Sequence, residues 1–511
     1  MPSKSRVLKP IPIAVKAAFL LMIVNATLLA QSNQPAACAH PGFNPRPWLE
    51  DFAQLTAEMS VHYANLEYAV QERRMDLPQL RRDTEAKVSQ SCDEQDARKA
   101  LESFFKAFGD GHLVIDWPKP AAPAEVAKPA ESQSLCTRLG YKKFGFKPGI
   151  DFASLPPSNG VPVFTDFGGA EADWFPGGVL RMNDTVRLGV LRMPIFSEHA
   201  YPGACEQTIQ EMRLQNSDKC DEQCEDRIEI ATANRLTAAM VRRVEQLKAA
   251  GATAILVDIT RNGGGSDWVE PLPRQLSRVP LREAPSGFIK HEHWTKQLKE
   301  KLGNVETDLK NGSQPKDVLE EKAARLRSAI TRSQEHCDRS QVWVDGKLPC
   351  SLLVNDVFFG GSNLLQYAVP GSFASLQSKT DLFYPLDYNY TESSDRLPLY
   401  VVVDAGTGSA AEYFPAVLQD NGAATIIGEV TGGAGCGYTN GGIPTTLKNS
   451  QATVKMPDCV RYRKNGMNEV AGVTPDVLVP WSTHDSPYIK AQQVLRSLTA
   501  IVGTEMGHSS H

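Results

Sequence analysis

Residues 401–414 read VVVDAGTGSAAEYF: a β-branched run, a turn of small residues and the start of a helix. This order predicts a buried strand that ends in a tight turn, with Ser409 at the N-terminus of the following helix. A serine in that place either caps the helix or presents a nucleophilic hydroxyl beside free backbone N–H groups and the positive end of the helix dipole. The segment alone favours the cap, which is the commoner role of a serine before a helix.

A second segment has the same design. Residues 255–265 read ILVDITRNGGG, a strand that runs into three successive glycines. Such a turn lets the backbone approach a substrate closely and offers N–H donors, although an ordinary tight turn has the same composition. The helix-like stretch 227–249 leads into the apolar strand 254–258, and this is the βαβ signal of an α/β sheet.

Together with two later motifs, these segments resemble the carboxyl-terminal processing peptidase family. The family has a strand ending in Asp, Arg, Asn and paired glycines, then Thr-x-Ser-Ala-x-Glu, Gly-Glu-x-Thr-x-Gly and Gly-x-x-Pro-Asp elements. The corresponding stretches here are, in order, 258–265, 407–412, 428–433 and 472–476. The resemblance covers about residues 179–280 and 398–480. It implies an α/β fold with a crotonase-like ββα catalytic core, and a serine-type peptidase that uses no metal and no cofactor.

The chain departs from the family at the general base. Most members place a lysine in a Thr-x-Gly-Lys-Gly stretch, but residues 431–435 read TGGAG, and Ala434 cannot accept a proton from Ser409. Two branches of the superfamily lack this lysine. One resembles the tricorn protease core, with a histidine base and a downstream glutamate; the other resembles the retinoid-binding protein of the photoreceptor matrix, which keeps the fold as a ligand carrier.

The tricorn-like branch supplies candidates for the missing base. The resemblance implies that His112, in GDGHL at 109–113, is the general base and acid, and that Glu469, in NEVAG at 468–472, orients it. A histidine has a pKa near neutrality, and a carboxylate would fix its tautomer and stabilise the imidazolium. Ser409 is then the nucleophile, with the backbone N–H groups of Gly264 and Ala410 as the oxyanion hole.

Each assignment has a plainer alternative. His112 could cap carbonyls at the end of a helix, and Glu469 could be a surface glutamate whose role falls to Asp476 or Glu429. In the tricorn-like site a serine precedes the histidine, whereas Gly111 stands there in this chain. Asp110 is expected to position the turn that presents the histidine.

The N-terminus has the layout of a secretory signal peptide. An apolar run at 17–29 precedes the polar stretch QSNQ and follows four cations: Lys4, Arg6, Lys9 and Lys16. The run is shorter than the roughly 20 residues that a spanning helix needs, which favours cleavage after Ala30 over a membrane anchor. We therefore expect export to the periplasm or the extracellular space, and no membrane association of the mature form.

Cysteine content and charge agree with that compartment. All ten cysteines lie beyond the expected cleavage site, and their even number and wide spacing favour up to five disulfides over a zinc cluster. A disulfide between Cys436 and Cys459 would brace the site. The net charge is −5, and loss of the four leader cations would make it −9, which argues against nucleic acid as a partner.

The predicted organisation has five parts. They are a signal peptide at 1–30, an N-terminal helical domain at 31–117 ending in the His112 turn, a Pro/Ala-rich linker and irregular segment at 118–178, a catalytic domain at 179–485 and a C-terminal helix and tail at 486–511. The irregular segment is where a degenerate PDZ domain would lie. A helical insertion at about 285–395 is rich in Lys, Glu and Arg, so we expect it to be solvated and assign it no chemistry.

The sequence thus predicts an exported serine endopeptidase or C-terminal processing peptidase that cleaves peptides or unfolded proteins through a Ser409 acyl-enzyme. The alternative is an inactive family member that serves as a binding or carrier protein. Loss of the lysine favours the carrier, and retention of Ser409 with His112 favours the enzyme. Substrate preference, disulfide connectivity and oligomeric state are left open.

Overall fold

The structure is a computed structural model that describes residues 42–119, 133–158, 163–169, 171–438, 444–482 and 484–508. The expected signal peptide at 1–30 and most of the expected linker lie outside these residues. Within the described ranges, every helix is too short or too polar to cross a membrane.

A seven-stranded sheet forms the centre of the molecule, in the order β13-β9-β8-β5-β4-β3-β2. The strands from β13 to β4 run parallel, and β3 and β2 are antiparallel. Their bounds are β2 Phe164–Asp166, β3 Gly177–Arg181, β4 Arg187–Arg192, β5 Ala254–Asp258, β8 Leu399–Val403, β9 Thr425–Gly428 and β13 Val477–Leu478. Because β5 and β8 lie at the middle of the sheet, all of their residues are buried, as the continuous apolar runs predicted.

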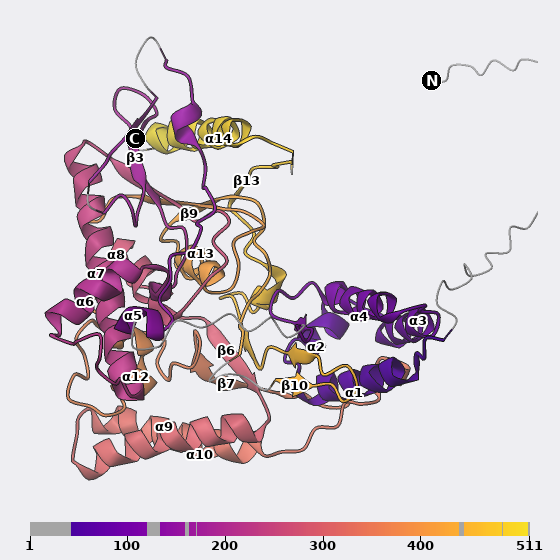
Figure 1. Ribbon diagram of the computed structural model, residues 1–511. Helices are drawn as coiled ribbons and strands as arrows, with labels where there is room; N and C mark the ends of the chain where they lie inside the picture. Colours follow the sequence, from indigo (N-terminus) through magenta and orange to yellow (C-terminus); the bar gives the residue numbers. More distant parts are fainter. Residues whose placement is uncertain are drawn as a thin grey trace, which may run out of the picture.

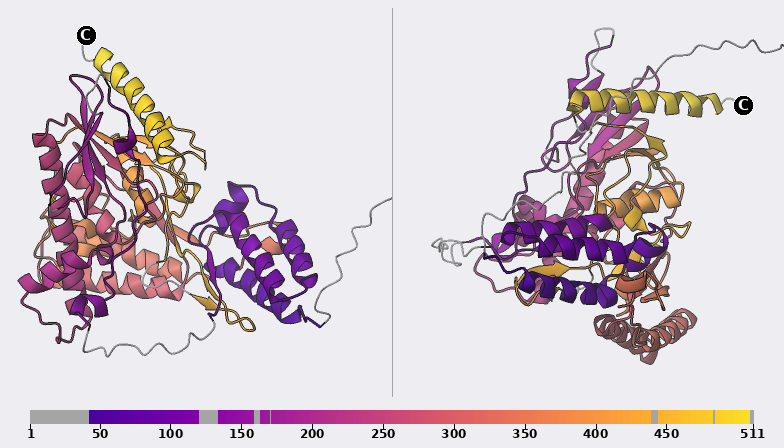
Figure 2. Two further views of the ribbon diagram at one scale, coloured as in Figure 1. Left: turned by 45° about the horizontal axis from the view of Figure 1, so that its top comes forward. Right: turned by 90° about the vertical axis from the view of Figure 1, so that its right-hand side faces the viewer.

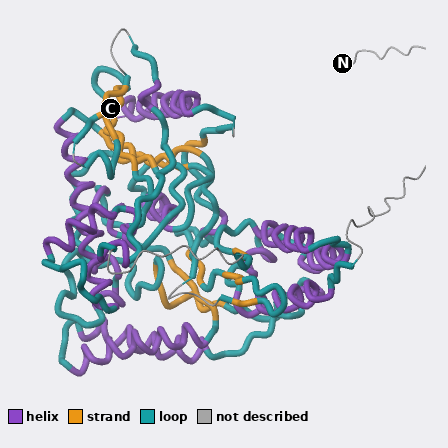
Figure 3. Tube along the Cα trace, viewed as in Figure 1, coloured by secondary structure: helices purple, strands orange, loops and turns teal. Residues whose placement is uncertain are grey.

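Helices cover both faces of this sheet. Ile255 and Val257 of β5 belong to the core under α6 Pro202–Glu211, α7 Glu222–Ala249, α8 Pro271–Leu276 and α13 Ala410–Asp420. Ala254 and Leu256 point to the other core, which α14 Pro487–His508 covers. This alternation follows from the two-residue period of a strand. The α/β class expected from the sequence is confirmed (Figures 1 and 3).

The N-terminal helices form a body beside the sheet (Figures 1 and 2). These are α1 Arg46–His62, α2 Leu66–Gln71, α3 Leu77–Ser89 and α4 Glu94–Phe108. Aromatic residues dominate their shared core, with Phe52 and Phe104 rings in edge contact at 4.9 Å between centroids. The chain leaves α4 through Gly109, whose φ of +60° gives the left-handed cap that ends many helices.

Two small sheets lie outside the central one, and the first of them links the N-terminal body to the rest of the chain. β1 Val114–Asp116 pairs antiparallel with β11 Thr453–Lys455, and β11 also pairs with β10 Thr445–Thr446. The other sheet contains β6 Pro285–Ile289, β7 Leu353–Phe359 and β12 Cys459–Arg461. The first ladder begins two residues after His112, so it fixes where that histidine lies.

The predicted helical insertion contains α9 Glu292–Lys310 and α10 Lys316–Ser333, which pack side by side (Figure 1). The remaining short helices are α5 Leu135–Arg138, α11 Val342–Asp345, α12 Lys379–Leu382, η2 Phe152–Ser154, η3 Glu198–Ala200, η4 Asp267–Val269, η5 Tyr384–Asp387 and η6 Glu469–Ala471. In the irregular segment at 134–178, the described residues form α5, η2, β2 and the start of β3.

Disulfides join four pairs of the described cysteines. The pairs are Cys136–Cys205, Cys220–Cys224, Cys337–Cys350 and Cys436–Cys459. No cysteine of the described residues is free. The sequence-based preference for disulfides over a zinc cluster is confirmed.

Candidate active site

Ser409 lies where a buried strand turns into a helix. β8 ends at Val403, and α13 starts directly after the serine. The φ of Ser409 is +57°, a region that residues other than glycine occupy rarely and that clusters at functional sites. The Oγ of the hydroxyl lies 2.9 Å from His112 Nε2.

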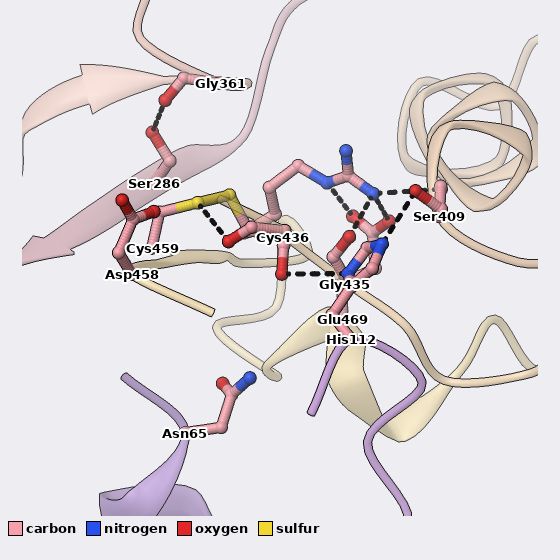
Figure 4. The surroundings of a disulfide bond; sticks show 12 residues. Asn65, His112, Ser286, Gly361, Ser409, Gly435, Cys436, Asp458, Cys459 and Glu469 are labelled. Carbon is pink, nitrogen blue, oxygen red and sulfur yellow. Dashed lines mark hydrogen bonds and ion pairs between the residues drawn. A yellow bond between two sulfur atoms is a disulfide. The ribbon is translucent and has the colours of Figure 1, made fainter. Parts of the chain in front are cut away.

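His112 comes to Ser409 from 297 residues away in the sequence. Its Nδ1 lies 3.2 Å from the backbone carbonyl of Cys436, so Nδ1 is the donor there and carries the proton (Figure 4). That tautomer leaves the Nε2 lone pair free to accept the hydrogen of the Ser409 hydroxyl. The pair therefore has the geometry that a nucleophile and its general base would need.

The buried carboxylate of Asp110 holds the histidine turn. It accepts hydrogen bonds from the backbone N–H of His112 at 2.9 Å, from Asn65 Nδ2 at 2.8 Å and from the Tyr63 hydroxyl at 3.0 Å. Burial raises the pKa of Asp110, although the hydrogen bonds and His112 act in the opposite direction. The sequence-based role of Asp110 in shaping this turn thus has contacts to support it, and these contacts tie the turn to α1 and α2.

Ala434, at the family's lysine position, packs directly under the histidine turn. A Cβ atom on Gly111 would lie 3.0 Å from the Ala434 Cβ, and the Gly111 N–H donates to the Gly433 carbonyl at 3.3 Å. The space that a lysine side chain would occupy is therefore filled by the backbone that presents His112. A larger side chain at position 111 or at position 434 would press against the other loop, so both positions hold small residues.

The buried carboxylate of Glu412 links Ser409 to the loop that contains Ala434. One oxygen accepts from the backbone N–H groups of Ser409 at 3.0 Å and Ala434 at 2.7 Å, and the other from Gly433 N–H at 2.7 Å and from the Thr431 hydroxyl. Burial raises the pKa of Glu412. Sequence reasoning gave this residue no role, although its place three residues after the serine, inside the family motif, was an available signal.

Glu469 does not contact the imidazole of His112. Its carboxylate, 3% exposed, forms a two-point ion pair with Arg461, at 2.6 Å from Nη2 and 3.2 Å from Nε. The Arg461 Nη2 also donates to the carbonyls of Gly435 at 2.9 Å and Ser409 at 3.2 Å. The Cys436 carbonyl lies at His112 Nδ1, where a carboxylate was predicted, and Glu469 is linked to the Ser409 backbone carbonyl through Arg461.

The two carboxylates weighed as substitutes for Glu469 lie elsewhere. Asp476 accepts from Gln419 Nε2 at 2.7 Å and from the Ile426 backbone N–H at 2.8 Å, a structural role between α13 and β9. Glu429 lines a different cavity, beside Arg261 and Lys490.

The predicted oxyanion-hole donors differ in availability. Gly264 lies against Ser409. Its φ is +104°, and a Cβ there would lie 2.7 Å from the Ser409 Cβ. Its N–H, however, donates to Asn262 Oδ1 at 2.9 Å. The N–H of Ala410 has no acceptor among the described residues, and it begins α13, where the helix dipole is positive. Ala410 is therefore the donor that this geometry leaves free.

One group of metal-type ligands lies near the glycine turn. Glu198, His199 and Glu229 bring three ligand atoms within 4.8 Å of one another. His199 faces Glu198 with Nδ1 at 3.0 Å and Glu229 with Nε2 at 3.3 Å, and the Glu198 contact contributes most to raising the pKa of His199 to about 10. Both nitrogens then carry protons, so the group is an ion-pair triad, and Glu198 also accepts from Ser266 beside the glycine turn.

Comparisons with known proteins bear on the family and the fold. Residues 300–479, which include Ser409 and Ala434, match the model of "Peptidase family S41". A curated "Uncharacterized protein" of Chlamydia muridarum is 28% identical over 116 residues, which are 22% of this chain and 19% of that protein. The match thus spans about a fifth of the chlamydial relative.

Solved structures share the fold. Mature CPAF, and mature CPAF complexed with lactacystin, each superpose with a TM-score of 0.52 at 15% identity, covering 91% of this chain and 99% of theirs. The family match over residues 300–479 supports the resemblance to the C-terminal processing peptidases that the sequence motifs indicated.

Restoring the family's lysine should damage this site. We expect Ala434→Lys to lower the rate of Ser409 labelling by a fluorophosphonate probe about 100-fold, because the longer side chain must displace the Gly111–His112 turn and the contribution of a general base is of that order. Labelling by Ala434→Lys that equals the unmodified protein, or that survives in the Ala434→Lys, His112→Ala double variant, would contradict the steric argument.

Removing the Cys436–Cys459 disulfide should lower activity as well. The double variant Cys436→Ser, Cys459→Ser frees the carbonyl that fixes the His112 tautomer, so we expect labelling to slow by about tenfold or more. The matched control is Cys220→Ser, Cys224→Ser, which removes a disulfide outside the site and should label at the normal rate. Equal rates in both double variants would exclude the positioning role.

The His199 triad should make stability depend on pH. Its folded-state pKa of about 10 exceeds the unfolded value of about 6.5. The stabilisation is therefore complete below pH 6.5 and is lost as pH rises through 10. The difference in free energy of unfolding between the unmodified protein and His199→Gln, measured in urea from pH 6 to 11, should shrink across that window. A His199 imidazole that titrates near 6.5 by NMR would contradict this.

Proposed function

We propose that this chain, a serine-type peptidase of the S41 family, hydrolyses peptide bonds through an acyl-enzyme on Ser409, with His112 in place of the family's lysine. The observation that carries the proposal is the 2.9 Å contact between Ser409 Oγ and His112 Nε2, with Nδ1 committed to the Cys436 carbonyl. An inactive carrier would have no need for this contact, for the strained φ of Ser409 or for a fixed tautomer.

Acylation follows from these positions. His112 Nε2 takes the hydroxyl proton while Ser409 Oγ bonds to the substrate's carbonyl carbon, and the carbonyl oxygen becomes an oxyanion. The free N–H of Ala410 and the positive end of α13 stabilise that charge. The imidazolium then gives its proton to the amide nitrogen, the C–N bond breaks and the amine leaves.

Deacylation reverses the roles. Water attacks the ester carbon while His112 takes its proton, and the Ser409 oxygen leaves with that proton when the acid product forms. His112 carries a positive charge in both transition states. The Cys436 carbonyl at Nδ1 stabilises that charge as a hydrogen-bond acceptor.

The natural substrates are peptides or unfolded proteins, and the setting is the periplasm or the extracellular space. The family supports the peptide substrate. The paired cysteines of the described residues support an oxidising compartment. The cleavage products will show whether the cleaved bond is internal or close to a substrate's C-terminus.

A fluorophosphonate serine-hydrolase probe tests the dyad. We expect the purified, oxidised protein to be labelled, Ser409→Ala to give no labelling, and His112→Ala to label about 100- to 10,000-fold more slowly, because that is the usual contribution of a general base. The same order of activities should hold for digestion of denatured casein.

The chain offers matched controls on its surface. Ser340→Ala and His336→Ala change the same residue types at exposed positions of the insertion and should leave labelling unaltered. A correctly folded protein that neither reacts with the probe nor digests casein would refute the proposal and favour a binding protein.

A further inference from the structure

A cavity of about 440 Å³ opens between η4, which follows the glycine turn, and α9 of the insertion. One wall is formed by Asp267 and Glu270, around η4, and the opposite wall by Glu300, Lys301 and Asn304 of α9. The sequence analysis assigned no chemistry to the insertion, but its helix α9 forms part of the wall of this cavity.

The cavity adjoins the Ser409–His112 pair on two sides. Tyr438 lines it, donates a hydrogen bond to the His112 backbone carbonyl at 3.3 Å and places its ring 5.8 Å from the imidazole. Asp267 lines it three residues after Gly264, which touches the nucleophile. A peptide bound across Ser409 would therefore place a side chain of a nearby residue within reach of this cavity.

Carboxyl groups outnumber cations in the lining. Four carboxylates face it, Asp267, Glu270, Glu300 and Asp381, against the single cation Lys301. Lys301 is already used, because its Nζ lies 2.9 Å from Asp381 Oδ1. Asn304 satisfies the second Asp381 oxygen at 2.8 Å. Three carboxylates remain without a cation from the cavity wall.

Two of these carboxylates lack the partners that such groups normally have. Glu270 is only 8% exposed, and its Oε2 is buried without a hydrogen bond of normal geometry in the described part of the chain. Burial raises the pKa of this carboxyl, although Arg274 and Asn363 act in the opposite direction. The side chain of Asp267 has no hydrogen bond or ion pair to any described residue and is open to the cavity. A buried carboxylate oxygen without a donor is costly, and a cationic ligand would supply both the charge and the N–H groups.

The arrangement fits an organic cation better than a metal ion. Among the described residues, the three-ligand group that converges within 4.8 Å is the His199 triad, and none forms in this cavity. A Lys or Arg side chain has the length to reach separated carboxylates. Tyr384 and Tyr438 also line the cavity, and the ring faces of tyrosines attract ammonium and guanidinium groups.

We propose that this cavity is a substrate subsite that binds a lysine or arginine side chain lying within a few residues of the scissile bond, with Asp267 and Glu270 as its recognising carboxylates. This inference rests on the proposed peptidase function, because it names the kind of peptide that Ser409 receives.

Cleavage mapping tests the subsite. Denatured casein, and casein with its lysines acetylated, are digested, and the cut positions are identified by mass spectrometry. We expect Lys and Arg to be enriched at one fixed position from the cut, and acetylation to abolish the lysine-directed cuts alone. Asp267→Asn and Glu270→Gln should each reduce the enrichment about tenfold, since a charge-assisted hydrogen bond is worth about that factor. Asp317→Asn, an exposed carboxylate of α10, is the control and should keep the preference.

A binding measurement separates this proposal from the proposed function. Fluorescein-labelled Ala-Ala-Lys-Ala-Ala and its norleucine analogue are titrated into Ser409→Ala by fluorescence anisotropy. Binding about tenfold tighter for the lysine peptide, lost in Ser409→Ala, Asp267→Asn, supports the subsite even if the unmodified protein cleaves nothing. Ser409-dependent cleavage without Lys or Arg enrichment, or equal affinity for both peptides, overturns the subsite and leaves the peptidase proposal standing.

Discussion

The pairing of β1 with β11 is the constraint on which the contact between Ser409 and His112 depends. It joins residues 114–116 to residues 453–455 and so holds the histidine turn of the N-terminal body against the loops that follow β9. The Asp110 contacts with Tyr63 and Asn65 fix the other side of the turn. His112 therefore reaches Ser409 because two distant parts of the chain share one small sheet, and the imidazole needs this support since its own segment is a short loop.

Close packing holds the turn that carries His112 against the loop that carries Ala434. Gly111 and Ala434 leave just enough room for the two backbones to meet, and Glu412 anchors the loop under them to the N–H of Ser409. Arg461, neutralised by Glu469, ties the carbonyls of Ser409 and Gly435 together from the opposite side. Together, these buried polar contacts hold Ser409 Oγ and His112 Nε2 at a fixed distance.

Some of this could be predicted from local sequence because its cause is local. The apolar runs of β5 and β8 have the composition of buried parallel strands, and the turns after them occupy the edge of the sheet where loops carry function. Ser409 and His112 were likewise identified from short motifs. The prediction for Glu469 failed at the level of contacts: a motif identifies an acidic residue but not its partner, and the nearby Arg461 claims that carboxylate.

The sequence by itself determined the α/β class, the strand-turn-helix that presents Ser409, the histidine available to serve it and the cysteine pairing chemistry, because each depends on residue type and spacing along a short stretch. The tertiary structure alone decided that the Cys436 carbonyl fixes the His112 tautomer, that the Gly264 N–H is taken by Asn262, and that α9 encloses an acidic cavity. These features arise between segments tens to hundreds of residues apart, where packing and the competition among neighbouring donors and acceptors choose the partners.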